Sequence, residues 1–347
     1  MSMKKFTAVL LIFAVAALFV FAGCQKNQNV NDNETTQEQS DATIKEPVDK
    51  TKPEVTGQQE DVFPLTITDA HGTEMTLPEK PQKIASISLV SDEMLFSLVD
   101  ADRIAATTHL AIDDGISNVA DEAKDITLRL NQSDTEKIIA LGPDLVIVSS
   151  WTDSTFIQQL RDAKIVVYAM ETADDIEHLN GIVKKIALLV GESAKGEELL
   201  SWMDEKLTTI EDKVSLLKDD EKKSVLFCDA FWSTYGKGTT SDDIASRAGL
   251  INVASRAGIE GWSQVSKESI ISWNPDIIFL PAWSYDGKFD PEDFKKKIVE
   301  DESLKSVNAV KNGRVYLLED KHMTSTSQYM VLGVEDAAKT AYPELFK

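Results

Sequence analysis

The chain has 347 residues and a formal net charge of −22 at pH 7. That length is enough for two domains with ample hydrophobic cores. Such a strongly acidic chain is not expected to bind nucleic acid or to adsorb to an anionic lipid surface.

The N-terminus has the pattern of a secretory signal. Two lysines precede the apolar run 6–21, which is short for a single membrane-spanning anchor, the alternative interpretation. The Gly-Cys pair that follows resembles the end of a bacterial lipobox, in which the cysteine is lipidated. We therefore expect a signal peptide over 1–23 and a lipid anchor on Cys24. The polar segment 24–61 has almost no large apolar side chain to bury, so we expect a disordered tether there.

Residues 62–190 alternate between strand and helix patterns, which predicts an α/β lobe with a parallel sheet. The strand predicted at 84–90 leads into a helix that Ser91 can cap. The polar stretch 109–130 is predicted to be a loop near the ligand. The remaining predictions for this lobe are a hairpin at 63–77, strands at 103–107 and 165–170, and helices at 153–162 and 176–190.

Residues 193–217 predict one long helix. Its apolar residues recur in steps of three and four, as one narrow stripe of a helix requires. They are Leu200, Met203, Leu207, Ile210, Val214 and Leu217. Such a helix would be about 37 Å long. We expect it to join two lobes as a stiff spine; the alternative is an ordinary surface helix of one lobe.

Residues 222–347 are predicted to form a second α/β lobe. Its first strand, 224–228, is followed by a loop at 229–240 that is rich in aromatic residues and glycine. The remaining predictions are helices at 241–248, 291–300 and 327–341 and a strand at 314–318.

One stretch occurs twice. EKIIALGPDLVIVSSW (136–151) and ESIISWNPDIIFLPAW (268–283) agree at six of sixteen positions without a gap. Each copy predicts a short helix, a break before proline and a buried strand. The helix start and the strand exit then lie at the same sheet edge, where ligands bind in open α/β sheets. Each lobe would bring one glutamate and one tryptophan there.

The candidate ligand contacts lie on strand exits and the loops after them. They are Trp151, Trp232, Tyr235, Trp262, Trp283 and Tyr285, with Arg129 and His322 as polar contacts. Such a concentration of aromatic rings suits a large, flat, partly apolar ligand. The alternative for each ring is a lid over the local core. These loops hold few basic residues, which favours a near-neutral chelate over a trianionic catecholate complex.

Four phrases carry a family resemblance when taken in order: PQKIASISLVSDEMLFSL (81–98), EKIIALGPDLVIV (136–148), GWSQVSKESIISWNPDIIF (261–279) and VKNGRVYLL (310–318). The chain resembles the substrate-binding lipoproteins of bacterial ABC importers, in the iron-siderophore and cobalamin group. The resemblance implies two Rossmann-like lobes with parallel sheets joined by one long α-helix, the class III periplasmic-binding-protein architecture. It also implies a ligand between the lobes, an iron chelate or a corrinoid, and no further cofactor.

The resemblance further implies a lipid-anchored protein outside the cytoplasmic membrane that serves an importer permease dimer and its ATPase. In that family one glutamate on each lobe docks onto permease arginines, and Glu136 and Glu268 are the candidates here. The alternative is that each glutamate only complements its helix dipole.

Other functions fit less well. The chain has only four histidines for a zinc or manganese site, and a haem would use His322 or a tyrosine. No Gly-x-Ser-x-Gly, His-Glu-x-x-His or complete Walker motif is present. Cys228 and Asp229 would point to opposite faces of their strand, so no nucleophile has a base and we expect no enzyme. A non-transport surface lipoprotein remains an alternative.

Overall fold

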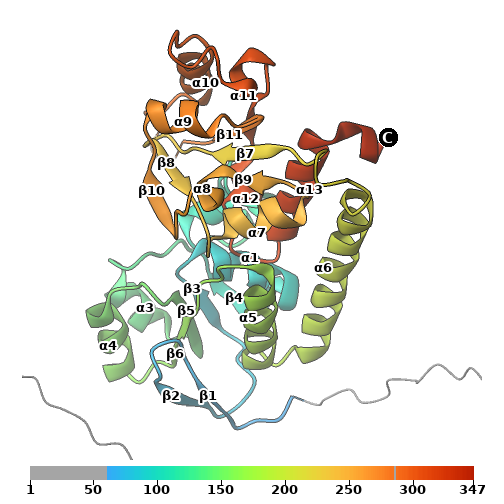
Figure 1. The fold of residues 1–347 in the computed structure, drawn as a ribbon. Helices are drawn as coiled ribbons and strands as arrows, with labels where there is room; N and C mark the ends of the chain where they lie inside the picture. Colours follow the sequence, from blue (N-terminus) through green and yellow to red (C-terminus); the bar gives the residue numbers. More distant parts are fainter. Residues whose placement is uncertain (1–60, 285–286) are drawn as a thin grey trace, which may run out of the picture. The chain divides into compact units, whose positions relative to one another are not determined.

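Two four-stranded parallel sheets form the frame of the molecule (Figure 1). The computed structural model describes residues 61–284 and 287–347. The first sheet has the order β4-β3-β5-β6, with β3 at Ile84–Ser86, β4 at Ile104–Ala106, β5 at Leu145–Ser149 and β6 at Val167–Met170. The second has the order β12-β11-β7-β9, with β7 at Ser224–Phe227, β9 at Ile251–Asn252, β11 at Ile277–Pro281 and β12 at Val315–Leu318. The predicted α/β class with parallel sheets is confirmed.

Helices connect the strands of each sheet. In the first lobe they are α1 (Leu89–Leu98), α2 (Ala120–Ala123), α3 (Thr135–Leu141), α4 (Ser154–Asp162) and α5 (Ile176–Leu189), with 3₁₀ turns η1 (Ala101–Arg103) and η2 (His109–Ile112). In the second they are α7 (Thr240–Arg247), α8 (Val253–Arg256), α9 (Lys267–Trp273), α10 (Pro291–Val299), α11 (Asn308–Lys311), α12 (Asp320–Met323) and α13 (Met330–Ala341), with η3 (Pro343–Phe346). Two antiparallel pairs complete the fold: β1 (Leu65–Thr68) with β2 (Glu74–Leu77), and β8 (Ser233–Tyr235) with β10 (Trp262–Gln264).

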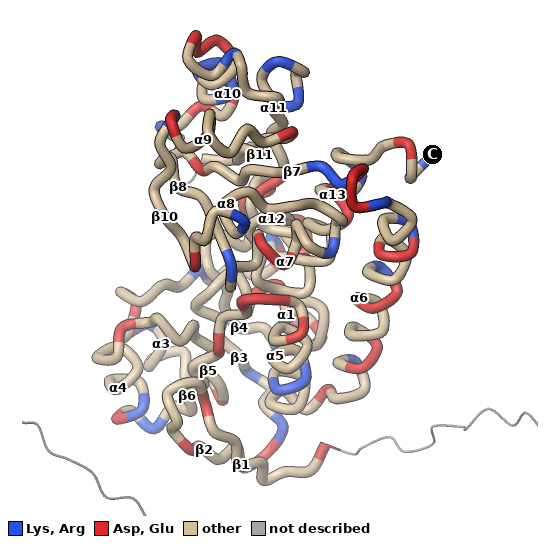
Figure 2. The backbone as a smooth tube through the Cα atoms, in the orientation of Figure 1, with Lys and Arg blue, Asp and Glu red and all other residues tan. Residues whose placement is uncertain are grey.

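The long helix α6 (Ser193–Val214) packs against α5 of the first lobe and α13 of the second. Its buried stripe belongs to one cluster of buried side chains that continues into both lobes. Gly196 lets α5 approach closely, since a Cβ there would lie 2.5 Å from the Cβ of Ala187. Acidic and basic residues occupy the outer side of α6 (Figure 2). Because both lobes share this cluster, movement between them would have to repack it.

The two copies of the repeat have the same local structure for the same reasons. Each short helix ends at a residue in the left-handed conformation, Gly142 (φ 59°) and Asn274 (φ 45°). The next two positions hold a buried proline and an aspartate. Asp144 accepts hydrogen bonds from the backbone N–H of Gln82 and Lys83, each 2.8 Å long, just before β3.

In the second copy, Asp276 accepts from the backbone N–H of Ser224 (3.0 Å) at the start of β7. In both lobes, therefore, the proline-aspartate pair turns the helix into a strand and fixes that strand to its neighbour. β5 and the first four residues of β11 are buried, as the continuous apolar runs predicted.

Several element boundaries differ from the predictions. Helix α1 begins at Leu89 rather than at the predicted position 91, because the Ser88 side chain accepts a hydrogen bond from the Ser91 N–H and is the N-cap. Helix α6 ends at Val214, three residues early, and Leu216 beyond it is exposed. The predicted loop 109–130 contains η2 and α2, and the predicted loop 229–240 contains β8. In the described parts of the chain, no helix is long and apolar enough to cross a membrane.

Candidate ligand-binding site

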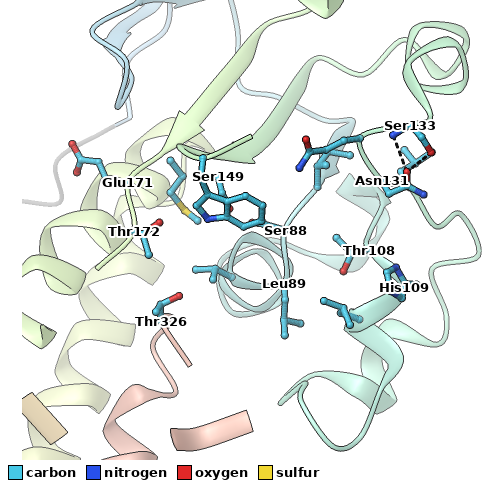
Figure 3. Close-up of a pocket in the computed structure, with 17 residues that line it drawn as sticks. Ser88, Leu89, Thr108, His109, Asn131, Ser133, Ser149, Glu171, Thr172 and Thr326 are labelled. Atoms are coloured by element: carbon cyan, nitrogen blue, oxygen red, sulfur yellow. Dashed lines mark hydrogen bonds between the residues drawn. The ribbon is translucent and has the colours of Figure 1, made fainter. Parts of the chain in front are cut away.

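A cavity of about 580 Å³ lies where the strands of the first sheet end (Figure 3). Its walls come from the residues that follow β3, β4 and β6, from the segment before α3, and from the end of β5. Thr326 adds a side chain from the second lobe. The carboxyl edge of the parallel sheet therefore carries the cavity, as the topology predicted.

Neutral groups dominate the lining. Hydroxyl and amide groups come from Ser88, Thr108, Asn131, Gln132, Ser133, Ser149, Thr172 and Thr326. Apolar surface comes from Ile87, Leu89, Val90, Leu110, Leu130, Trp151 and Met170. No lysine or arginine is among the described residues that line the cavity. The lining therefore suits a ligand with apolar parts, neutral hydrogen-bonding groups and little negative charge.

The anionic residue in the lining is Glu171, and its charge is already paired. Lys185 Nζ contacts the Glu171 carboxylate at 2.9 Å. The hydrogen bond from Lys185 lowers the pKa of Glu171. The cavity rim at this point is consequently close to neutral.

The imidazole of His109 also lines the cavity (Figure 3). This residue is exposed, and no residue in the described ranges forms a hydrogen bond with its ring. Its ring nitrogens are therefore available to a bound ligand.

A buried carboxylate, Asp92, holds part of the cavity lining in place. Asp92 accepts hydrogen bonds from the Thr108 hydroxyl (2.6 Å) and the Thr108 N–H (3.2 Å). The hydroxyls of Ser86, Ser91 and Ser88 form a chain beside it, with oxygen distances of 2.6 and 2.7 Å. Burial raises the pKa of Asp92 to about 7, although its hydrogen bonds act in the opposite direction. This network fixes Ser88 and Thr108, whose side chains face the ligand space.

Of the predicted ligand contacts that the structure describes, only Trp151 lines this cavity, with 69% of its surface exposed. Tyr235 lines a smaller hollow of about 70 Å³ in the second lobe, where its hydroxyl donates to Asp229 (2.8 Å). Trp262, on β10, is 68% exposed. Tyr285 lies outside the described residues.

Trp283 joins the two lobes. Its indole Nε1 donates to Asp113 Oδ1 of the first lobe, 3.1 Å away. A Cβ on Gly115 would lie 2.1 Å from the Trp283 ring, so the ring lies directly against this glycine. The indole thus contacts the opposite lobe.

Three other predicted contacts lie elsewhere. The Arg129 guanidinium donates to the backbone carbonyls of Ala123 and Ile126 and so stabilises its own loop. His322 Nδ1 lies 2.6 Å from Asp336 Oδ2. Trp232 packs edge-on against Phe294 in the second lobe, with ring centroids 5.6 Å apart. None of the three lines the cavity, because local carbonyls, a carboxylate and a core ring already engage these side chains.

Sequence reasoning missed the small polar residues of the cavity. Ser88 and Ser149 lie at strand exits, where the topology predicts ligand contacts, but the residues predicted there were mainly aromatic. His109 is the first residue of the stretch predicted to lie near the ligand and Asn131 directly follows it, but no motif singled out either side chain.

Glu136 and Glu268 occupy the first turns of α3 and α9 and are both exposed. Neither forms a salt bridge with any residue that the structure describes. The backbone N–H of Glu268 and the Ser266 hydroxyl lower the pKa of the Glu268 carboxyl. These contacts at the start of α9 support the alternative that Glu268 complements its helix dipole. The carboxylates of both glutamates are open to solvent.

A family model for periplasmic binding proteins matches residues 84–322. The chain belongs to this family of binding proteins. An uncharacterised ABC transporter substrate-binding lipoprotein of Bacillus subtilis, YvrC, is 30% identical over 298 residues, which cover 84% of this chain and 89% of the relative. A cobalamin-binding protein of Halobacterium salinarum is 24% identical, covering 62% of this chain and 58% of the relative.

The fold is also found among solved structures. Haemophilus influenzae MolA, bound to molybdate, superposes with a TM-score of 0.67 at 22% identity, over 81% of this chain and 92% of that one. The architecture is that of class III periplasmic binding proteins. This periplasmic binding protein is therefore the substrate-binding component of an ABC importer, and its family is non-catalytic.

Proposed function

We propose that this protein captures a near-neutral metal chelate, an iron(III)-siderophore or a cobalamin-type corrinoid, between its two lobes and delivers it to an importer permease. The observation that carries this proposal is the lining of the first-lobe cavity, which has many neutral polar groups and, among the residues that the structure describes, no lysine or arginine.

The charge of a candidate ligand decides how well it fits this cavity lining. An oxyanion such as molybdate, or a trianionic catecholate complex, is best bound by cationic side chains or by several convergent N–H groups. This cavity offers hydroxyls, side-chain amides and apolar surface instead. A hydroxamate-type chelate or a corrinoid has apolar parts and neutral amide or hydroxamate oxygens that match such a lining.

Size and aromatic surface agree with this choice. A cavity of about 580 Å³ lies within the usual range for small-molecule sites, roughly 300–1,000 Å³. Trp151 of the first lobe presents an exposed indole to the ligand. Phe231 and Trp262 of the second lobe are also highly exposed, and the backbone carbonyl of Phe231 accepts a hydrogen bond from Gln264 of β10. Trp151 offers stacking surface at the cavity, and we propose Phe231 and Trp262 as further stacking surface for a ligand wider than the cavity.

Haem is a second candidate, and one observation favours it. The His109 imidazole lines the cavity with both ring nitrogens available, so it can coordinate a metal with an open axial position. His322, the residue predicted for this role, is engaged by Asp336. A haem complex of the purified protein would lose its axial-ligand absorbance in a His109→Ala variant.

Delivery and anchoring complete the proposal. The carboxylates of Glu136 and Glu268, one on each lobe, would orient the protein on arginines of a permease dimer. Cys24 would carry the lipid anchor, 1–23 would be removed and 24–61 would act as a tether; these positions lie outside the described residues, apart from Asp61. The lobes would span 62–190 and 222–347, with 193–217 as the linking segment.

Tryptophan fluorescence tests where the ligand binds. Ferric hydroxamate chelate, cobalamin and haem are titrated into the protein and into its Trp151→Phe and Trp202→Phe variants. Trp202 is the matched control, since it packs edge-on against Tyr329 away from the cavity. We expect at least one ligand to quench emission, and Trp151→Phe to remove most of that quenching while Trp202→Phe preserves it. Equal quenching in all three proteins would place the ligand elsewhere.

A further inference from the structure

The repeat has six identical pairs, and the structure explains three of them by folding. Ile138 and Ile270 are buried in their cores. The buried prolines and their aspartates turn each helix into its strand and fix the neighbouring strand. The two tryptophans differ between the copies, since Trp151 is exposed and Trp283 contacts the other lobe.

The remaining two pairs are exposed in both copies. They are Glu136 with Glu268, and Ile139 with Ile271. The isoleucines are 42% and 38% exposed, which places both among the exposed large hydrophobic residues of the described chain. Single exposed aliphatic residues are common and need no explanation. The recurrence of an exposed isoleucine at the same position of two helices, 132 residues apart in the sequence, does need an explanation.

The neighbouring outer positions of the two helices differ between the copies, unlike the glutamate and the isoleucine. Between the two copies, Lys137 is replaced by Ser269, and the exposed Ala140 by the exposed Ser272. The outer positions of these helices therefore accept other residues, and folding does not require an isoleucine at the outer position. Among the exposed positions of the two helices, only the glutamate and the isoleucine three residues later are the same.

The spacing places each glutamate and isoleucine side by side. Residues three apart on a helix are neighbours on one face, about 5–6 Å apart at Cβ. The nearby lysines are neutralised within the protein, because Lys137 pairs with Asp134 and Lys267 with Asp301. Each lobe thus displays, beside an aliphatic side chain, a carboxylate that forms no salt bridge with any residue in the described part of the chain.

We propose that Ile139 and Ile271 are contact residues for the importer's membrane subunits, each inserting beside its glutamate into an apolar hollow next to a cationic side chain. This inference rests on the proposed docking of Glu136 and Glu268 and adds the apolar part of the same surface. Because the patch occurs twice, it fits a partner that presents one such hollow on each of two equivalent subunits. Exposed charge mainly sets the rate and orientation of encounter, whereas a buried aliphatic contact mainly slows dissociation.

The test measures association and dissociation rates on the cognate permease–ATPase complex, purified from the producing bacterium and held in lipid nanodiscs. The variants are Ile139→Ser, Ile271→Ser, Glu136→Gln and Glu268→Gln. Val299→Ser is the matched control, since Val299 is 39% exposed on α10 and lies outside the repeat. An unchanged far-ultraviolet circular dichroism spectrum and thermal unfolding midpoint show that each variant is folded.

We expect each isoleucine variant to dissociate about tenfold faster, with little change in association rate. Ile271→Leu should restore most of the binding, and Val299→Ser should behave as the unmodified protein. The glutamate variants should associate more slowly and lose salt dependence. The inference would be overturned if both isoleucine variants dissociated at the unmodified rate while the glutamate variants bound the complex more weakly. That result would leave the proposed docking of the glutamates intact. No effect from any of the four would overturn the docking as well.

Discussion

The indole of Trp283 in the second lobe donates a hydrogen bond to Asp113 of the first lobe, with 3.1 Å between Nε1 and Oδ1. A second polar bridge between the lobes lies nearby. The buried carboxylate of Glu93 accepts from Asn118 of its own lobe and from the Ser327 hydroxyl of the other, and Asn118 donates to the Lys321 carbonyl. The arrangement of the lobes thus depends on specific contacts in addition to the shared core around α6.

A methyl group at position 115 should disrupt the Trp283 contact. In Gly115→Ala the new Cβ would lie 2.1 Å from the Trp283 ring, so the ring has to move. Overpacking of this kind costs about 1–3 kcal/mol. We expect a change in tryptophan emission and a lower unfolding free energy in denaturant titration. Gly181→Ala is the control, since a Cβ there meets nothing within 4 Å in the middle of α5, and it should not destabilise the protein. Equal behaviour of the two variants would contradict the ring position.

Asp92 should make the protein less stable as pH rises from about 4 to 7. Burial raises the pKa of Asp92 from 3.8 to about 7 in the folded state. In that interval the folded state holds a proton that the unfolded state has released, so raising the pH favours unfolding. The loss is on the order of 4 kcal/mol for a shift of this size.

Asp92→Asn tests this dependence, because an amide does not titrate. We expect urea unfolding of the unmodified protein to weaken between pH 4 and 7, and the variant to show a smaller decrease. Asp320, whose pKa burial raises to about 6, contributes in the same direction in both proteins. Identical pH profiles would show that Asp92 ionises normally in the folded state.

The repeated aspartates should stabilise both lobes. Asp144→Ala leaves two backbone N–H groups before β3 without their acceptor. Asp276→Ala removes the acceptor of the Ser224 backbone N–H and hydroxyl at the start of β7. Loss of such hydrogen bonds costs about 1–3 kcal/mol. Asp212→Ala on α6 is the control, since its carboxylate has no partner among the described residues and the change should stay within about 0.5 kcal/mol. Chemical denaturation gives the free energy of unfolding of the three variants. If Asp144→Ala and Asp276→Ala lose no more of this free energy than Asp212→Ala, the hydrogen bonds contribute little to stability.

The helices and strands of the two lobes could be predicted from the sequence better than the residues that line the cavity. Continuous apolar runs identified β5 and β11, because a strand covered on both faces must be apolar throughout. The end of α6 was placed three residues late, since Leu217 fits the stripe and no glycine or proline marks the stop at Val214. Local periodicity therefore determines elements well and their ends less well.

Side-chain direction was the main source of error at the site. Arg129 turns to carbonyls of its own loop, and His322 turns to Asp336, fourteen residues away. Neither partner can be chosen from sequence spacing alone. Trp151 does line the cavity, because a residue just past the end of a parallel strand lies at the carboxyl edge of the sheet whatever its neighbours are.

Ligand charge provides the most direct test of the central claim. Isothermal titration calorimetry would compare a neutral ferric trihydroxamate and cobalamin with a trianionic ferric catecholate and molybdate on the same protein. The described lining of the cavity holds no lysine or arginine. We therefore expect a neutral chelate to bind at least about 100-fold more tightly than either anion, since an uncompensated charge in such a site costs several kcal/mol. Tighter binding of the catecholate or of molybdate would contradict the account.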